Sequence, residues 1–199
     1  KIIIRQTADK IIAHLDDTKS VNLNNVYNVG RPPKGLHIKY ILAILNSNLM
    51  KMAYRAISQE KGKLFAEVKK VYLEKLPFKI IAEEQQRPFI EKAEIMLAKN
   101  KELHDASSKF LALLKSEFGL DKPGGKLEQW YTLDFAAFVA ELTKKKITLT
   151  LAQKAEWMEH FEKQKATAAA LKFTIDTTDR EIDQMVYALY GLTPDEIAI

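Results

Sequence analysis

The sequence predicts an α+β protein, in which a small mixed β-sheet with a packed helix is followed by long antiparallel α-helices. β-branched apolar runs separated by polar turns occupy residues 1–29, as is typical of short strands. Apolar residues then recur at every third or fourth position over residues 38–57, and again over longer stretches after residue 83. That spacing is the period of amphipathic helices.

Composition limits the class of protein. Of the 199 residues, 47% are hydrophobic and 29% are charged, which is enough apolar mass for one large or two small domains. No run reaches the roughly 18 apolar residues of a membrane span, so no membrane partner is expected. The absence of cysteine excludes disulfides and agrees with a cytoplasmic location. Because the chain starts Lys-Ile-Ile-Ile, we expect a piece of a longer protein whose sheet begins upstream.

The first expected elements are strands. The apolar runs that predict them are residues 2–4, 11–15 and 21–29, the last with an irregularity at residues 24–25. The loop GRPPKG at residues 30–35 is expected to be stiff, because two prolines fix φ between two glycines.

One continuous helix is expected next, over residues 38–57, followed by the polar run SQEKGK at residues 58–63. Residues 65–72 then alternate with a period of two, which favours a short strand over a second helix. Leu76-Pro77 closes this part of the chain, because proline cannot donate a hydrogen bond to a ladder.

Residues 83–199 are expected to be helical. A long helix over residues 83–118 ends at Gly119, a candidate left-handed cap, and DKPGG at residues 121–125 is a loop. A short helix is expected at residues 133–145. A second long helix starts at residue 150, continues or kinks, and ends at Gly191, before a capping box at residues 193–196. The two long helices should pair antiparallel, much like a coiled coil.

We expect two parts in the chain, residues 1–82 and residues 83–199. Their net charges differ as well. Residues 1–80 contain 15 Lys and Arg against 6 Asp and Glu, a net charge of +9, whereas residues 81–199 have a net charge of −4. The basic part could neutralise phosphates, and the acidic part would be a scaffold or protein-contact arm. Alternatively, the lysines only keep a small sheet soluble.

Several segments, in this order, resemble one family. ILAILNS at residues 41–47, SQEKG at residues 58–62 and Leu76-Pro77 resemble the TaqI-like C-terminal specificity domains of restriction–modification enzymes and, more loosely, type I specificity subunits. The tail at residues 130–197 is similar as well, so the resemblance covers nearly the whole chain. It implies a target recognition module, of type IIG or type I organisation, that chooses the DNA site for a separate catalytic portion.

The resemblance implies two partners: double-stranded DNA, and the methyltransferase or endonuclease portion of the same protein or complex. Residues 1–82 would recognise the DNA target, and residues 83–199 would be a helical spacer and docking region. S-adenosylmethionine and Mg are expected only in the catalytic portion. The chain contains no Asn-Pro and no Gly-x-Gly, so it lacks the methyltransferase's base-holding motif and usual cofactor loop. No cofactor and no enzymatic activity are therefore expected for this chain alone.

Other chemistry has weaker support. Glu67-Val68-Lys69 contains the E-x-K triplet of metal-dependent nucleases, but no aspartate lies between Asp17 and Asp105 to complete the site. The four histidines lack zinc-binding spacing, so no metal site is predicted. His160 is expected on a helix surface, and Trp130 and Tyr131 are expected in the core.

Reading of DNA bases requires hydrogen-bonding groups on a rigid platform, with cations on the flanking phosphates. The polar run around Gly62 offers an amide, a carboxylate and two ammonium groups. The predicted DNA-contacting residues are Arg5, Gln6, Lys10, Arg31, Lys34, Gln59, Lys61, Lys63 and Lys69. The alternative function is a helical protein–protein docking scaffold that does not contact DNA, in which each of these is an ordinary solvated side chain.

Overall fold

The computed structural model describes residues 1–18, 21–22, 25–58 and 66–198. The chain forms two compact units: residues 1–96 together with 178–199, and residues 97–177. Two long helices, α4 (Glu83–Phe118) and α7 (Leu151–Tyr190), contribute residues to both units.

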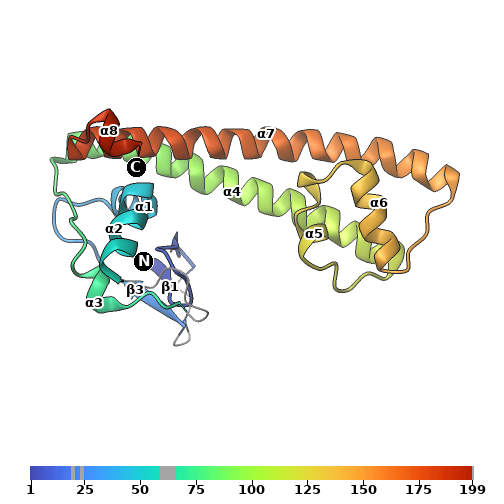
Figure 1. The fold of residues 1–199 in the computed structure, drawn as a ribbon, viewed down its shortest axis with the longest axis horizontal. Coiled ribbons are helices and arrows are strands. Elements are labelled where there is room, and N and C mark those ends of the chain that lie inside the picture. Colours follow the sequence, from blue (N-terminus) through green and yellow to red (C-terminus); the bar gives the residue numbers. More distant parts are fainter. Residues whose placement is uncertain (19–20, 23–24, 59–65, 199) are drawn as a thin grey trace. The chain divides into compact units, whose positions relative to one another are not determined.

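The first unit contains a three-stranded sheet (Figure 1). Its central strand, β1 (Ile2–Arg5), lies between β2 (Ala13–Leu15) and β3 (Val26–Val29), and both pairings are antiparallel. Side chains alternate between the two faces of a strand, which places Ile2 and Ile4 in the core. The predicted α+β class is confirmed, and the described sheet is antiparallel where a mixed sheet was predicted.

The single helix predicted over residues 38–57 is instead two helices, α1 (Ile38–Asn46) and α2 (Asn48–Ser58). Ser47 separates them, because its backbone is extended, with φ −63° and ψ 154°. Its hydroxyl donates to the carbonyl of Ile44 (2.7 Å) and accepts from the N–H of Met50 (3.3 Å). Serine suits a helix start because its oxygen replaces the backbone acceptor that the first N–H groups lack. The apolar period runs on through this break, so periodicity alone does not predict it.

Replacing Ser47 by alanine removes this cap and is expected to lower the free energy of unfolding by about 1 kcal/mol. Urea-induced unfolding measures the change. Ser108→Ala is the control, since Ser108 is exposed on α4, and a surface substitution of this kind changes stability by about 0.5 kcal/mol or less. Equal effects of the two substitutions would show that the break does not depend on the Ser47 hydroxyl.

The strand predicted at residues 65–72 is wrong in its described part. Residues 66–69 have no regular secondary structure, and α3 (Lys70–Leu73) is a single helical turn; residue 65 lies outside the described residues. Val68 contacts the end of β1 through one hydrogen bond, from its N–H to the carbonyl of Gln6 (2.7 Å). β1 already has a partner strand on each side, so neither edge is open to a further strand.

The first unit also contains residues 83–96 of α4 and residues 178–190 of α7. Lys92 and Glu181 form an ion pair between them (2.6 Å). Tyr40 of α1 is buried edge-on against Phe78 and Phe89, and its hydroxyl donates to the carbonyl of Lys79 (2.7 Å). Burial raises the pKa of Tyr40 to about 12. The tail ends in α8 (Pro194–Ile197), with the predicted capping box.

The second unit has an aromatic core between residues 97–118 of α4 and 151–177 of α7. Three short helices complete it: α5 (Gly125–Glu128), η1 (Trp130–Thr132) and α6 (Phe135–Lys144). Phe110 stacks on the buried Trp130 with ring centroids 3.8 Å apart. Phe110 also contacts Phe161, and Phe118 contacts Trp157, so residue numbers run in opposite directions along the two helices. Their predicted antiparallel pairing is confirmed in this unit.

Most local predictions for residues 83–199 are confirmed. Gly119 and Gly191 follow the long helices with φ of 64° and 71°, a left-handed conformation that glycine adopts without strain. The helix α7 continues without a break. The prediction that His160 lies on a helix surface needs correction. Its side chain is half-buried and stacks parallel to Phe110, with ring centroids 6.0 Å apart. Among the described residues, no helix is both long enough and apolar enough to cross a membrane.

Candidate nucleic-acid interface

The candidate interface lies at the end of β1 in the first unit. The N–H of Gln6 donates to the carbonyl of Asn25 (3.1 Å), and its carbonyl accepts from the N–H groups of Ala8 (2.9 Å) and Val68 (2.7 Å). The backbone of Gln6 therefore joins the turn after β1, the start of β3 and the segment of residues 66–69. Arg5 and Lys69 have exposed side chains here, and Gln6 is half-buried.

The segment of residues 67–69 is also held from α2, by Tyr54. The Tyr54 hydroxyl accepts from the N–H of Lys69 (2.8 Å) and donates to the carbonyl of Glu67 (3.2 Å). Its ring is fully buried and packs edge-on against Tyr72, with centroids 6.3 Å apart. The sequence gives no signal that Tyr54 is a site residue, because a tyrosine among the apolar positions of a helix is typical of a core residue with a satisfied hydroxyl.

The next residue of α2, Arg55, contacts the connection between β1 and β2. Its Nη2 lies 2.7 Å from an Oδ2 of Asp9, and the two side chains are 36% and 40% exposed. A pair this accessible to water contributes about 1 kcal/mol or less to stability. The pair nevertheless places Asp9 beside α2. Lys10, the next residue, is half-buried at this end of the sheet.

Gln59, Lys61 and Lys63 lie outside the described residues. The chain enters their stretch from Ser58, at the end of α2, and leaves it at Ala66, beside the segment that Gln6 and Tyr54 hold.

Arg31 and Lys34 lie in the loop that follows β3, at the other end of the sheet. Arg5 of β1 lies opposite Val26, and Ile2 lies opposite Val29, so the loop after Val29 starts beside Ile2. With a rise of roughly 3.3 Å per residue, the two ends of β1 are about 10 Å apart. The predicted residues therefore do not form one cluster: Arg5, Gln6, Lys10 and Lys69 lie at one end of the sheet, and Arg31 and Lys34 follow the other end.

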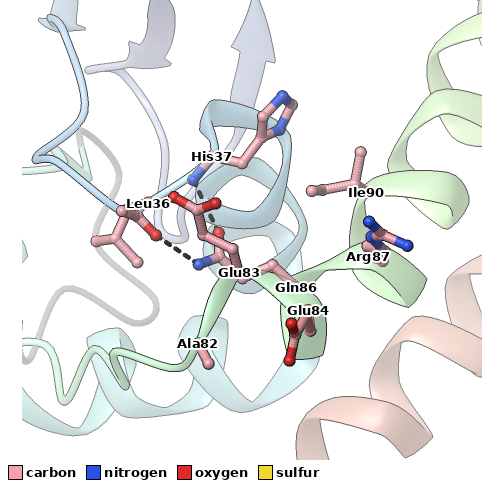
Figure 2. A pocket seen from close by; sticks show the side chains of 9 residues that line it. Leu36, His37, Ala82, Glu83, Glu84, Gln86, Arg87 and Ile90 are labelled. Atoms are coloured by element: carbon pink, nitrogen blue, oxygen red, sulfur yellow. Dashed lines mark hydrogen bonds between the residues drawn. The ribbon is translucent and has the colours of Figure 1, made fainter.

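The loop that carries Arg31 and Lys34 is anchored by Gln86 of α4 (Figure 2). The buried Gln86 amide donates to the carbonyls of Gly35 (2.7 Å) and Ile81 (3.0 Å), and it accepts from the N–H of His37 (2.8 Å). Beside it lies a cavity of about 570 Å³, lined by Gly35, Leu36, His37, Ala82, Glu83, Glu84, Gln86, Arg87 and Ile90. Its two carboxylates, Glu83 and Glu84, outnumber its one arginine, Arg87, so the lining is net acidic and a poor candidate for a phosphate contact.

The start of α2 is fixed as well, by Asp183 of α7. The Asp183 carboxylate accepts from the backbone N–H of Asn48 (2.7 Å) and from its side-chain amide (2.6 Å), and only 6% of the residue is exposed. Burial raises the pKa of Asp183, against the opposing effect of the Asn48 hydrogen bond. The helix that carries Tyr54 and Arg55 is thus held at both ends. In the described ranges, no three His, Cys, Asp or Glu side chains are grouped as metal ligands.

Two family models match the chain. Residues 1–78 match the TaqI-like C-terminal specificity domain, which confirms the predicted resemblance over these residues. The prediction that the resemblance extends over residues 130–197 is wrong in its extent, because this match ends at residue 78 and a different model matches most of the tail. This match covers the sheet, α1, α2 and α3, and ends one residue after Pro77. Residues 82–186, more than half of the chain, match a second model, described as Domain of unknown function (DUF8810). No curated protein and no solved structure matches the chain.

Proposed function

We infer that this chain, which belongs to the DUF8810 family through residues 82–186 and carries a TaqI-like specificity domain in residues 1–78, recognises target DNA in a restriction–modification system. The match of residues 1–78 is the observation that carries this proposal. In it, residues 1–82 contact the DNA and residues 83–199 form a spacer and docking region. A separate portion, with S-adenosylmethionine and Mg²⁺, methylates or cleaves the selected site, and this chain has no catalytic role.

The geometry at the end of β1 supports a DNA-contacting role for that surface. Arg5 and Lys69 present exposed cations beside the half-buried amide side chain of Gln6, and Lys10 lies in the adjoining turn. Cations of this kind bind phosphates and set the register, whereas an amide can read a base edge. Hydrogen bonds to the carbonyls of Ile12 and Asn25, next to β2 and β3, and to the Tyr54 hydroxyl of α2 hold the backbone that carries these groups. A backbone held in this way can supply the rigid platform that base reading requires.

A protein-docking scaffold is the second candidate, and apolar side chains on α7 favour it. In the second unit, Leu151, Met158 and Phe173 are 86%, 51% and 69% exposed. Exposed apolar side chains on a helix are typical of a surface that another protein covers. Binding through such a surface depends weakly on salt, whereas DNA binding through phosphates weakens steeply as salt rises. Salt dependence therefore separates the two functions.

The test is the affinity for fluorescently labelled duplex DNA, measured by anisotropy over a range of salt concentrations. The first variant combines Arg5→Ala, Lys61→Ala and Lys63→Ala, and the second combines Arg31→Ala and Lys34→Ala. Each lost phosphate contact reduces the slope of log affinity against log salt by about 0.9, so we expect the first variant to lose about 2 to 3 units of slope. The second variant shows whether the other end of the sheet also contacts DNA.

The matched control combines Lys101→Ala, Lys109→Ala and Lys154→Ala, which removes the same charge from exposed positions of the second unit. It should retain the wild-type slope. A slope near zero for the wild-type protein would contradict DNA recognition and favour the docking scaffold. An equal loss in the control would show that net charge, and not the end of β1, determines the binding.

A further inference from the structure

We propose that Tyr54 is a positioning residue for DNA recognition: its hydroxyl holds residues 67–69 in place and, through the hydrogen bond from Val68 to Gln6, it holds the residue whose amide is the candidate base reader. The proposal rests on the proposed function and deepens it, because it assigns sequence discrimination to a buried residue that does not itself contact DNA. Tyr54 is fully buried on α2.

The backbone of residues 67–69 depends on hydrogen-bond partners from other parts of the first unit. These residues belong to no helix or strand of the described structure, so no ladder satisfies their backbone groups. In the described structure they are held by hydrogen bonds from Tyr54 to the carbonyl of Glu67, from Val68 to the carbonyl of Gln6, and from Lys69 to Tyr54. The carbonyl of Lys69 also accepts from the N–H groups of Tyr72 and Leu73, at the start of α3. Two of these hydrogen bonds involve the Tyr54 hydroxyl, which takes the place of a neighbouring strand for Glu67 and Lys69.

The Tyr54 hydroxyl is itself held in place by contacts of α2 with its surroundings. The Tyr54 ring packs edge-on against Tyr72, and the following residue, Arg55, forms the ion pair with Asp9. At its start, α2 is capped by Asp183 through two hydrogen bonds. Because α2 is held in this way, the hydrogen bonds of the Tyr54 hydroxyl also hold residues 67–69 at a defined distance from α2.

Base reading depends more strongly on the position of this segment than phosphate binding does. Hydrogen bonds to base edges weaken steeply when distance and angle change, and each good base contact contributes most of the discrimination at its position. Lysine contacts with phosphates tolerate small backbone shifts, because the side chain is long and the attraction acts over distance. Loss of the hydroxyl should therefore reduce discrimination while leaving the electrostatic component of affinity intact.

The test starts with a duplex that the wild-type protein selects from a randomised DNA pool. Affinities for this duplex and for a scrambled duplex of the same composition give a discrimination ratio. Tyr54→Phe is expected to lower the ratio about ten-fold, within the range of one lost base contact, and to leave the salt slope on the scrambled duplex unchanged. Amide hydrogen exchange of Lys69 should become faster in this variant, because its acceptor is removed.

Tyr72→Phe is the matched control. It removes the same atom from the ring that packs against Tyr54, and the described structure shows no hydrogen bond to the Tyr72 hydroxyl. A thermal melt of each variant checks that the first unit is folded at the assay temperature. An unchanged ratio in Tyr54→Phe, or an equal loss in Tyr72→Phe, would overturn the positioning role while the proposed function stands. A wild-type protein that selects no sequence from the pool would overturn both.

Discussion

Phe161→Ala is expected to lower the free energy of unfolding of the second unit by about 3 to 5 kcal/mol. Phe161 is fully buried, and its ring contacts those of Phe110, Trp130, Phe135 and Phe138 at centroid distances of 4.8 to 6.1 Å. Truncation removes these contacts and leaves a cavity that two long helices cannot easily close. Urea unfolding followed by tryptophan fluorescence measures this unit, because Trp130 and Trp157, the two tryptophans of the chain, both lie in it.

Phe173→Ala is the matched control, on the same helix and in the same unit. The Phe173 side chain is 69% exposed, so its truncation should change the free energy of unfolding by about 0.5 kcal/mol or less. Equal losses for Phe161→Ala and Phe173→Ala would contradict the aromatic core that the structure describes.

Asp183→Ala is expected to lower the free energy of unfolding of the first unit by about 2 to 3 kcal/mol, because a buried charge-assisted cap is lost. Without the carboxylate, the backbone N–H and side-chain amide of Asn48 both lose their acceptor. Hydrogen exchange of α2 amides should become faster, and this measurement reports the first unit directly. Asp179→Ala, one turn earlier on α7, is the control, and it should leave exchange in α2 nearly unchanged.

The pKa of Asp183 predicts how this stability depends on pH. Burial raises the pKa and the nearby Asp179 raises it further, whereas the hydrogen bond from Asn48 and the charge of Lys51 lower it. A raised pKa means that the folded state holds the proton more tightly than the unfolded state. The stability from this protonation is therefore fully present below the ordinary aspartate pKa, and it is lost as the pH rises through the raised value.

Asp183→Asn removes this titration and keeps one amide oxygen as an acceptor for Asn48. Over the rise from acid pH toward neutral, the wild-type protein should therefore lose free energy of unfolding relative to Asp183→Asn. Urea unfolding at a series of pH values measures the difference. A difference that is independent of pH would show that burial does not raise the pKa of this carboxyl.

Local signals in the sequence determined much of the fold. The helical period of the apolar residues predicted α4, α6 and α7 within a few residues of their observed bounds. Gly119, Gly191 and the capping box at Thr193 marked helix ends correctly, because each acts through its own backbone or its nearest neighbours. The TaqI-like resemblance was also present in the sequence, since it depends on the order of short segments.

Tertiary structure alone decided the arrangement of the candidate site. The start of α2 is capped by Asp183, which lies 135 residues away from Asn48, so no local pattern could reveal it. The alternation over residues 65–72 predicted a strand, but both edges of β1 were already occupied, and a tyrosine hydroxyl replaced the ladder. The register of β1 and β3 then separated Arg31 and Lys34 from the predicted contacts at the other end of the sheet. Side-chain type and local period are properties of the sequence, whereas hydrogen-bond partners distant in the chain depend on which edges and surfaces remain free after folding.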